Sequence, residues 1–312
     1  MSMPVWQDHR VVVAMGTGGV GKTTVSAALA IAAAASGRKT LVMTVDPARR
    51  LAQALGVADT GAERLRLDDA AWGQLGIAPK ATLDVLMPDI RATFDAMVAR
   101  YAASPAAHQA ILNNRIYRHL CTTMSGAHEY AAVEALFEVT RDREYDLIVL
   151  DTPPSQNALD FLDAPQRVVS FFDSAALPWL VRPAKLATKM SLKILDLGTQ
   201  WIYRAVAKVA GGQTLQEIGH FLVSLEGMYE GLSERARAMH TLLRSDEVAF
   251  VAVTAPGAGP AEATEAMCAQ LCGQQIAVRA LVVNRLHQAP FAAAARERVG
   301  AAVDQALAGW PA

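Results

Sequence analysis

The sequence predicts an α/β fold in which a doubly wound, mostly parallel sheet carries an α-helical insertion. Three observations support this prediction. Short apolar runs alternate with segments of helical period, each run ends at a polar residue or glycine, and one long stretch lacks any strand pattern. In such sheets, ligand-binding groups gather at the carboxyl ends of the strands. The residues that follow the runs are therefore candidate site residues, and they include Gly16, Asp46, Asp151 and Asn284.

Five apolar runs predict the strands in chain order, and helical patterns lie between them. Each run is short and rich in β-branched or aliphatic residues, as expected for strands that are buried on both faces. The predicted strands span 11–15, 40–45, 147–150, 248–253 and 276–283. The predicted helices span 25–35, 88–102, 127–140, 261–271 and 289–307.

Residues 168–243 form the stretch without a strand pattern, and they predict a helical insertion subdomain within the α/β domain. From Leu186 to Trp201, apolar residues recur every three or four positions, while lysines in residues 185–193 line another face. Two interpretations are open. The helix either packs inward with its lysines in water, or offers a surface to an apolar client, a partner helix or a membrane interface.

The length and composition indicate one folded domain, residues 1–312. Hydrophobic residues make up 52% of the chain and charged residues 19%, which is ample for a sizeable core. The formal net charge of -1 gives no general attraction to polyanions, so no nucleic-acid partner is expected. The N-terminal residues lack a secretory signal pattern, and no apolar segment approaches the roughly 18 residues that span a bilayer. We therefore expect a cytoplasmic protein without a transmembrane segment.

Residues 16–24 read GTGGVGKTT, directly after an apolar run and directly before an alanine-rich helical segment. This is the pattern and the context of a phosphate-binding loop, which makes the fold that of a P-loop NTPase. The glycines let backbone N–H groups converge on an anion, the lysine reaches the β- and γ-phosphates, and the first threonine offers its hydroxyl to Mg²⁺. A glycine-rich turn without a ligand would need neither the lysine nor two threonines. The predicted binding residues are Gly18, Gly19, Val20, Gly21, Lys22, Thr23 and Thr24.

Two aspartates follow predicted strands and are candidates for catalysis and metal binding. Asp151 follows four apolar residues, as in a Walker B strand whose carboxylate holds Mg²⁺ directly or through water, although it could instead cap a helix from Ser155. Asp46 precedes Pro47, so it either caps a helix or orients the water that attacks the γ-phosphate. The candidate catalytic residues are Lys22 and Asp46, and the candidate metal ligands are Thr23 and Asp151.

Asn284 follows the last predicted strand and carries both a hydrogen-bond donor and an acceptor. Its amide could pair with the edge of an adenine base, or it could cap the strand. The three cysteines, at 121, 268 and 272, form neither a disulfide framework nor a CxxC pair. Cys268 and Cys272 lie one helical turn apart, which leaves ordinary packing or a bound metal or metalloid as alternatives.

Four segments resemble the ArsA-type ATPases. This family includes the arsenite-pump ATPase and the tail-anchored-protein targeting ATPase, and it belongs to the wider class of deviant-Walker dimeric ATPases. The resemblance covers most of the chain in matching order, and it is closest to bacterial members of unassigned role. The segments are GTGGVGKTT at 16–24, TVDPARRLAQALG at 44–56, DLIVLDTPPSQNALDFLDAP at 146–165 and VVNR at 282–285.

The resemblance implies an ATP- and Mg²⁺-dependent homodimer or paralogous heterodimer whose helical subdomains form a client surface. Glu129 resembles the acidic residue of the family's PGxxE element, although an ordinary solvated glutamate is the alternative. The implied roles are phosphate and Mg²⁺ binding for Lys22, Thr23 and Thr24, water positioning for Asp46, the Walker B role for Asp151 and adenine binding for Asn284.

The sequence departs from the family pattern in ways that bear on activity. The family's signature lysine contacts phosphate across the dimer, but Thr17 stands at that position and cannot supply the cation. Slow hydrolysis is therefore expected, or a lysine-bearing paralogue completes the site. The zinc-binding CxxC of the targeting branch and the clustered cysteines of the arsenite branch are both missing. Little sequence follows residues 289–307 to cover an adenine base.

These features favour an ATP-driven dimeric switch that couples nucleotide state to the binding and release of a protein partner or hydrophobic client. A nucleotide-dependent scaffold with little hydrolysis is the main alternative. The chain could also be a chaperone for membrane-bound proteins, or a subunit of a paralogous heterodimer or of an anion or metalloid pump. A small-molecule kinase is the remaining possibility, with lid arginines drawn from Arg49, Arg50, Arg115 and Arg118.

Overall fold

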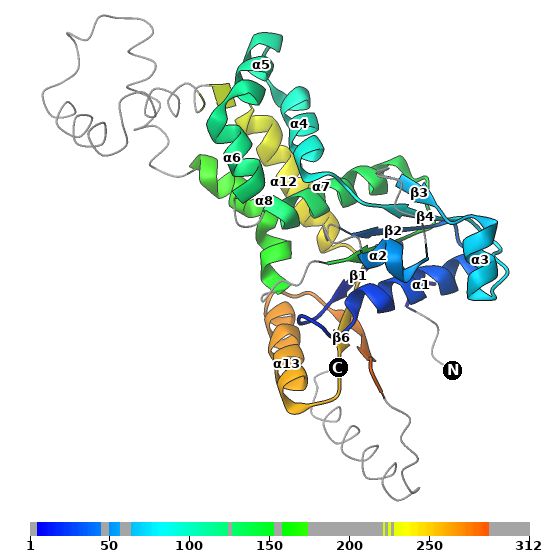
Figure 1. The fold of residues 1–312 in the computed structure, drawn as a ribbon. Helices are drawn as coiled ribbons and strands as arrows, with labels where there is room; N and C mark the ends of the chain where they lie inside the picture. The colour runs from blue at the N-terminus through cyan, green and yellow to red at the C-terminus, as the bar shows by residue number, and fades with distance from the viewer. Residues whose placement is uncertain are drawn as a thin grey trace, which may run out of the picture.

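The computed structural model describes residues 5–44, 50–56, 64–123, 127–152, 158–173, 221, 224–225 and 228–286. Its seven strands form one sheet in the order β3-β4-β2-β5-β1-β6-β7 (Figure 1). Every neighbouring pair is parallel except β3 and β4, which confirms the predicted α/β fold. The strands are β1 Val11–Met15, β2 Thr40–Thr44, β3 Arg64–Arg66, β4 Leu83–Leu86, β5 Leu147–Asp151, β6 Val248–Thr254 and β7 Val278–Val283.

The helices agree with the predicted ranges at four places and add others between them. None of the helices described is long and apolar enough to cross a membrane. The predicted helix 289–307 lies outside the described residues. The helices are α1 Lys22–Ser36, α2 Arg50–Ala54, α3 Asp69–Leu75, α4 Ile90–Tyr101, α5 Pro105–Asn113, α6 Arg115–Thr123, α7 Ala127–Asp142, α8 Ala158–Asp173, α12 Tyr229–Leu243 and α13 Ala258–Gly273.

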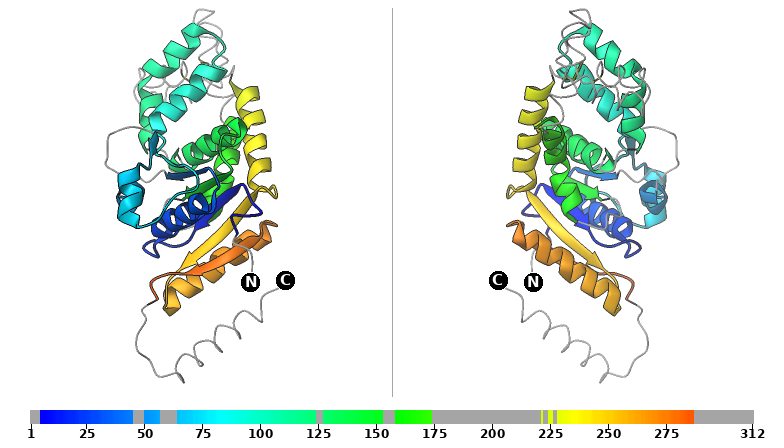
Figure 2. Two further views of the ribbon diagram at one scale, coloured as in Figure 1. Left: turned by 90° about the vertical axis from the view of Figure 1, so that its right-hand side faces the viewer. Right: turned by 90° about the vertical axis from the view of Figure 1, so that its left-hand side faces the viewer.

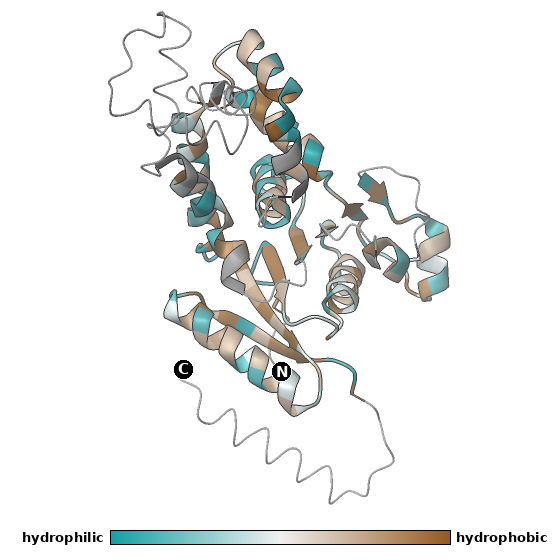
Figure 3. Ribbon diagram, turned by 60° about the vertical axis from the view of Figure 1, so that its left-hand side comes forward, coloured by the Kyte–Doolittle hydropathy of each residue, from teal (hydrophilic) through white to brown (hydrophobic). Residues whose placement is uncertain are grey.

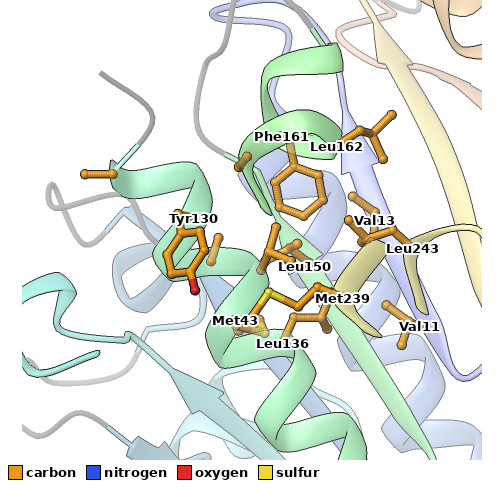
Figure 4. Packing of buried hydrophobic residues seen from close by; sticks show 14 of the residues in the cluster. Val11, Val13, Met43, Tyr130, Leu136, Leu150, Phe161, Leu162, Met239 and Leu243 are labelled. Atoms are coloured by element: carbon orange, nitrogen blue, oxygen red, sulfur yellow. The ribbon is translucent and has the colours of Figure 1, made fainter. Parts of the chain in front are cut away.

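Both faces of the central strands β1, β2, β5 and β6 are covered, which explains why these strands read as mostly apolar runs. Along β1, Val11 and Val13 pack in one hydrophobic cluster, while Val12 and Ala14 pack in another with α1. Figure 4 shows the first cluster, in which side chains from β1, β2 and β5 meet those of α7, α8 and α12. The central strands are correspondingly apolar in Figure 3, whereas the helices alternate between apolar and polar positions.

A helical region extends beyond the sheet, and it is built from two separate parts of the chain. Figures 1 and 2 show α4, α5 and α6 on the same side of the sheet as the upper part of α12. The ring of Tyr117 in α6 lies 6.4 Å from that of Phe221, and Phe94 in α4 stacks on Tyr130 in α7 at 5.5 Å. The helical region therefore includes residues 90–123, which the sequence analysis did not assign to it.

The predicted insertion, residues 168–243, is described only in part. Its first residues belong to α8 and its last to α12, and these two helices pack against each other. The stripe from Leu186 to Trp201 lies outside the described residues, so both interpretations of that helix stay predictions.

An ion-pair network joins α12 to α7 inside the helical region. The Arg235 side chain is 5% exposed and Glu134 is 7% exposed, with 2.5 Å between Arg235 Nη2 and Glu134 Oε1. Arg235 also binds Glu138, which in turn binds Arg100 of α4. The Arg235 guanidinium lies 4.3 Å from the centre of the Phe137 ring. Burial alone would lower the pKa of Arg235, but its bonds to Glu134 raise the pKa overall. The guanidinium is therefore held charged between α12 and α7, and Glu138 extends the network to α4.

Strands β3 and β4 were not predicted, because β4 contains a charged residue. Asp84 is buried there, and it accepts hydrogen bonds from Arg66 Nε at 2.7 Å and from the Tyr145 hydroxyl at 2.7 Å. Burial alone would raise the pKa of Asp84, but the bonds from Arg66 and Tyr145 lower it overall. These partners come from distant parts of the chain, so the apolar pattern alone did not reveal the strand.

Candidate functional site

The loop between β1 and α1 has a backbone path that requires glycine at particular positions. A Cβ atom at Gly16 would lie 2.2 Å from the carbonyl oxygen of Val253 in β6, which no side chain could tolerate. Gly21 has a φ of 90° and forms the N-cap of α1 in the left-handed region. The loop is thus pressed against β6 at its start and turns directly into the helix at its end.

The N-terminus of α1 is suited to binding an anion. No described side chain caps this helix end, and no acidic residue lies in its first turn. Gly18 and Gly19 are exposed, and a Cβ atom on either would meet no described atom within 4 Å. The uncapped first-turn N–H groups and the positive end of the helix dipole therefore offer donors of the kind that bind phosphate oxygens.

Lys22 places a positive charge within this loop. Its side chain is almost fully buried, and its Nζ atom donates to the carbonyl oxygens of Gly16 at 2.9 Å and Thr17 at 3.1 Å. These two acceptors belong to the loop itself, so the ammonium group is held beside the backbone that would surround a phosphate. The predicted placement of the lysine at the phosphate loop agrees with this geometry.

Thr23 and Asp151 meet at the carboxyl end of the sheet. The Thr23 hydroxyl donates to Asp151 Oδ2 at 2.7 Å, and the Thr44 hydroxyl approaches the same oxygen at 3.2 Å. Asp151 is 1% exposed, and the register of β2 and β5 places Thr44 directly beside it. Hydroxyl and carboxylate oxygens are the ligands that Mg²⁺ prefers, so this group fits the metal that the sequence implies.

Two threonines beside this group were not among the predicted ligands. Thr44 was treated only as part of a strand, although a polar residue at the end of an apolar run was a usable signal. Thr152 directly follows Asp151, and its buried hydroxyl donates to the carbonyl oxygen of Ala14 at 2.7 Å. This bond fixes the chain after Asp151 to the strand that leads into the phosphate loop.

Asn284 lies against the phosphate loop. Its backbone N–H donates to the carbonyl oxygen of Thr254 at 2.8 Å, and its side-chain Nδ2 donates to the carbonyl oxygen of Val20 at 2.9 Å. The sequence analysis considered adenine binding or strand capping for this amide. The contact with Val20 is a third arrangement, and adenine binding stays a prediction.

Within the described part of the chain, no side-chain hydrogen bond is seen between the remaining predicted residues and Thr23 or Asp151. Asp46 lies outside the described residues, as does Ser155, so their alternative roles stay predictions. Thr24 is exposed in the first turn of α1. Glu129 is half-buried in the first turn of α7, and no contact described here joins it to the loop. The structure therefore brings together Lys22, Thr23, Asp151 and Asn284.

The cysteines do not share one environment. Cys121 and Cys268 are buried, whereas Cys272 is exposed. Burial raises the pKa of the Cys268 thiol, with a smaller contribution from nearby Cys272. Within the described part of the chain, no three His, Cys, Asp or Glu side chains gather as they would around a metal ion.

Comparisons with known proteins identify the family to which the chain is similar. The family model of the anion-transporting ATPases, ArsA_ATPase, matches residues 9–298, which confirms the resemblance inferred from the motifs.

An uncharacterized protein of Streptomyces coelicolor is 30% identical over 209 residues, covering 64% of this chain and 48% of that protein. ATPase get3 of Aspergillus terreus is 27% identical over 277 residues, covering 87% of this chain and 71% of that protein. A candidate arsenical pump-driving ATPase of Aquifex aeolicus is 23% identical over 274 residues, covering 87% of this chain and 78% of that protein. The match thus spans about half of the Streptomyces protein and most of the other two.

Proposed function

The chain belongs to the anion-transporting ATPase family, and we propose on this premise that it is an ATP-hydrolysing switch whose nucleotide state controls binding and release of a partner. The observation that carries the proposal is the meeting of Lys22, Thr23 and Asp151 beside the uncapped N-terminus of α1. These residues supply a cation, a hydroxyl and a carboxylate where a nucleotide and its metal ion would bind.

In this proposal the residues of the loop divide the work of holding ATP. Lys22 neutralises charge on the β- and γ-phosphates, the first-turn N–H groups bind phosphate oxygens, and the Thr24 hydroxyl meets the α-phosphate. Thr23 and Asp151 hold Mg²⁺, and Asn284 contacts the adenine base. Bound Mg²⁺ would stabilise negative charge on the transferred phosphoryl group as a Lewis acid.

We assign the orientation of the attacking water to Asp46. β2 ends at Thr44, whose hydroxyl lies 3.2 Å from Asp151 Oδ2. Asp46 follows Thr44 by two residues in the sequence, and two residues of chain span at most about 7 Å. A carboxylate near the metal is suited to positioning and polarising a water molecule.

The path from the site to the helical region supports coupling between them. Residues 153–157 alone separate Thr152 from α8, and Thr152 is bound to the backbone of β1. α8 packs against both α12 and α7, which carry the ion-pair network of the helical region. A change at the γ-phosphate therefore has a short covalent route to the helices.

The proposal extends to a homodimer or paralogous heterodimer that binds a protein partner or hydrophobic client through its helical region. The helical region projects from the sheet and is joined to the site through α8 (Figure 2). Membership of this family supports a dimer in which two nucleotide sites face each other.

Hydrogen exchange tests the switch directly. With saturating Mg-ATP, we expect amide exchange in α8 and α12 to change by about tenfold, a size within the range of allosteric coupling. The Asp151→Asn variant, saturated with the same nucleotide, should show protection of the loop without the change in α8 and α12. Wild-type protection that is confined to the loop and α1 would rule out the switch but leave nucleotide binding intact.

A nucleotide-dependent scaffold with little hydrolysis is the second candidate, and Thr17 favours it. The family resemblance places a signature lysine at this position, but the residue here offers only a hydroxyl and a backbone carbonyl that accepts Lys22 Nζ at 3.1 Å. Without a cation from this position, negative charge on the transferred phosphoryl group is less well stabilised.

The Thr17→Lys variant is expected to hydrolyse ATP at least about tenfold faster than wild type, because it restores a cation aimed at the transition-state charge. Single-turnover rates measure this effect separately from product release. The Thr17→Met variant controls for side-chain length without the charge and should match wild type. If Thr17→Lys is no faster than wild type, the missing lysine does not limit hydrolysis.

A further inference from the structure

Asn284 is tied to two parts of the site at once. Its backbone N–H donates to the carbonyl oxygen of Thr254 at the end of β6, at 2.8 Å. Its side-chain Nδ2 donates to the carbonyl oxygen of Val20 in the phosphate loop, at 2.9 Å. The residue thus links the end of the edge strand β7 to a loop residue 264 positions earlier in the chain.

The loop is shaped to receive this amide. A Cβ atom at Gly21 would lie 2.2 Å from Asn284 Nδ2, so the amide packs on the bare Cα atom of that glycine. Val20 is buried, which fixes the residue whose carbonyl accepts the bond. The contact therefore combines a hydrogen bond with close packing against the last loop residue before α1.

The hydrogen bond from Asn284 to the Val20 carbonyl sets the direction of the Gly21 N–H group. In a planar trans peptide, the carbonyl group of one residue and the N–H group of the next point in opposite directions. Because Asn284 holds the Val20 carbonyl toward itself, the Gly21 N–H points away from Asn284. A loop that rotates this peptide loses one of the N–H groups that converge on phosphate.

We propose that Asn284 is a positioning residue of the phosphate loop, which holds the Val20–Gly21 peptide in its polyphosphate-binding orientation independently of any contact with the base. The inference rests on the proposed nucleotide-binding function. It is compatible with adenine binding, because an amide side chain has two N–H donors and a carbonyl acceptor, and Val20 uses one donor.

Binding of Mg-tripolyphosphate, which has no base, separates the two roles. By calorimetry, the Asn284→Ala variant should bind Mg-tripolyphosphate about fivefold more weakly than wild type, as expected for the loss of one hydrogen bond. The isosteric Asn284→Asp variant should lose more, because its carboxylate would face the carbonyl oxygen of Val20 and add a negative charge beside the phosphate loop. The Leu286→Ala variant is the matched control, since Leu286 is 68% exposed, and it should bind as wild type does.

The outcomes distinguish this inference from the function on which it rests. If Asn284→Ala binds Mg-tripolyphosphate like wild type and loses affinity only for Mg-ATP, the amide contacts the base alone and the inference is overturned. If wild type binds neither ligand, the proposed function itself fails. Faster hydrogen exchange at Gly21 and Lys22 in ligand-free Asn284→Ala, with unchanged thermal stability, would support the positioning role, and unaltered exchange there would contradict it.

Discussion

Replacing Lys22 by alanine is expected to reduce ATP hydrolysis by about 100- to 1000-fold, the usual cost of removing a group that stabilises transition-state charge. Lys22 is 6% exposed, and its ammonium group lies within hydrogen-bond distance of two loop carbonyls. Its removal leaves those carbonyls facing a polyanion without the lysine charge between them. Steady-state and single-turnover ATPase rates measure the loss.

The Lys80→Ala variant provides the control for Lys22→Ala. Lys80 is exposed, and its replacement should leave hydrolysis at the wild-type rate. Circular dichroism should show that both variants are folded. If Lys22→Ala hydrolyses ATP as fast as wild type, the assignment of the loop as the catalytic phosphate site is wrong.

Replacing Arg235 by alanine is expected to lower the free energy of unfolding by about 3–5 kcal/mol, which is typical for breaking a buried ion pair. Glu134 would remain buried without the guanidinium. Glu138 would keep only its ion pairs with Arg100 and Arg141, which are both exposed. The network crosses α4, α7 and α12, so its loss should loosen the helical region. Denaturant unfolding of the ligand-free protein measures the effect.

Two further variants show whether the effect comes from an unpaired buried charge. Arg235→Met combined with Glu134→Leu removes both charges and should cost less than Arg235→Ala alone. Arg141→Ala removes an exposed arginine 3.7 Å from Glu138 and should change stability by no more than about 0.5 kcal/mol. A double variant that is as unstable as Arg235→Ala would point to lost packing on Phe137 instead.

The apolar and polar pattern of neighbouring residues was enough to predict strand ends and the site residues beside them. The ends of β1, β5 and β6 were visible because buried parallel strands are continuous apolar runs that stop at a polar residue or glycine, and the mostly apolar edge strand β7 also stops at a polar residue. Lys22 and Thr23 were predicted from the phosphate-loop motif, and Asp151 was predicted from its place at the end of an apolar run. The structure brings the three together as those positions imply.

Features that depend on long-range pairing were not predictable. The contact between Asn284 and Val20 depends on where the edge strand lies. The contact between Thr44 and Asp151 depends on the register between β2 and β5, although the polar residue at a strand end was a local signal. β4 was hidden because buried Asp84 is stabilised by partners elsewhere in the chain. The same holds for Arg235 and Glu134, which are 101 residues apart.

The central claim is that the loop and the start of α1 bind the phosphates of a nucleotide. Isothermal titration of the folded wild-type chain with Mg-ADP and a non-hydrolysable ATP analogue tests it most directly. The structure predicts saturable binding of both, weakened strongly by Lys22→Ala. Absence of binding to well-folded wild-type protein would contradict the account.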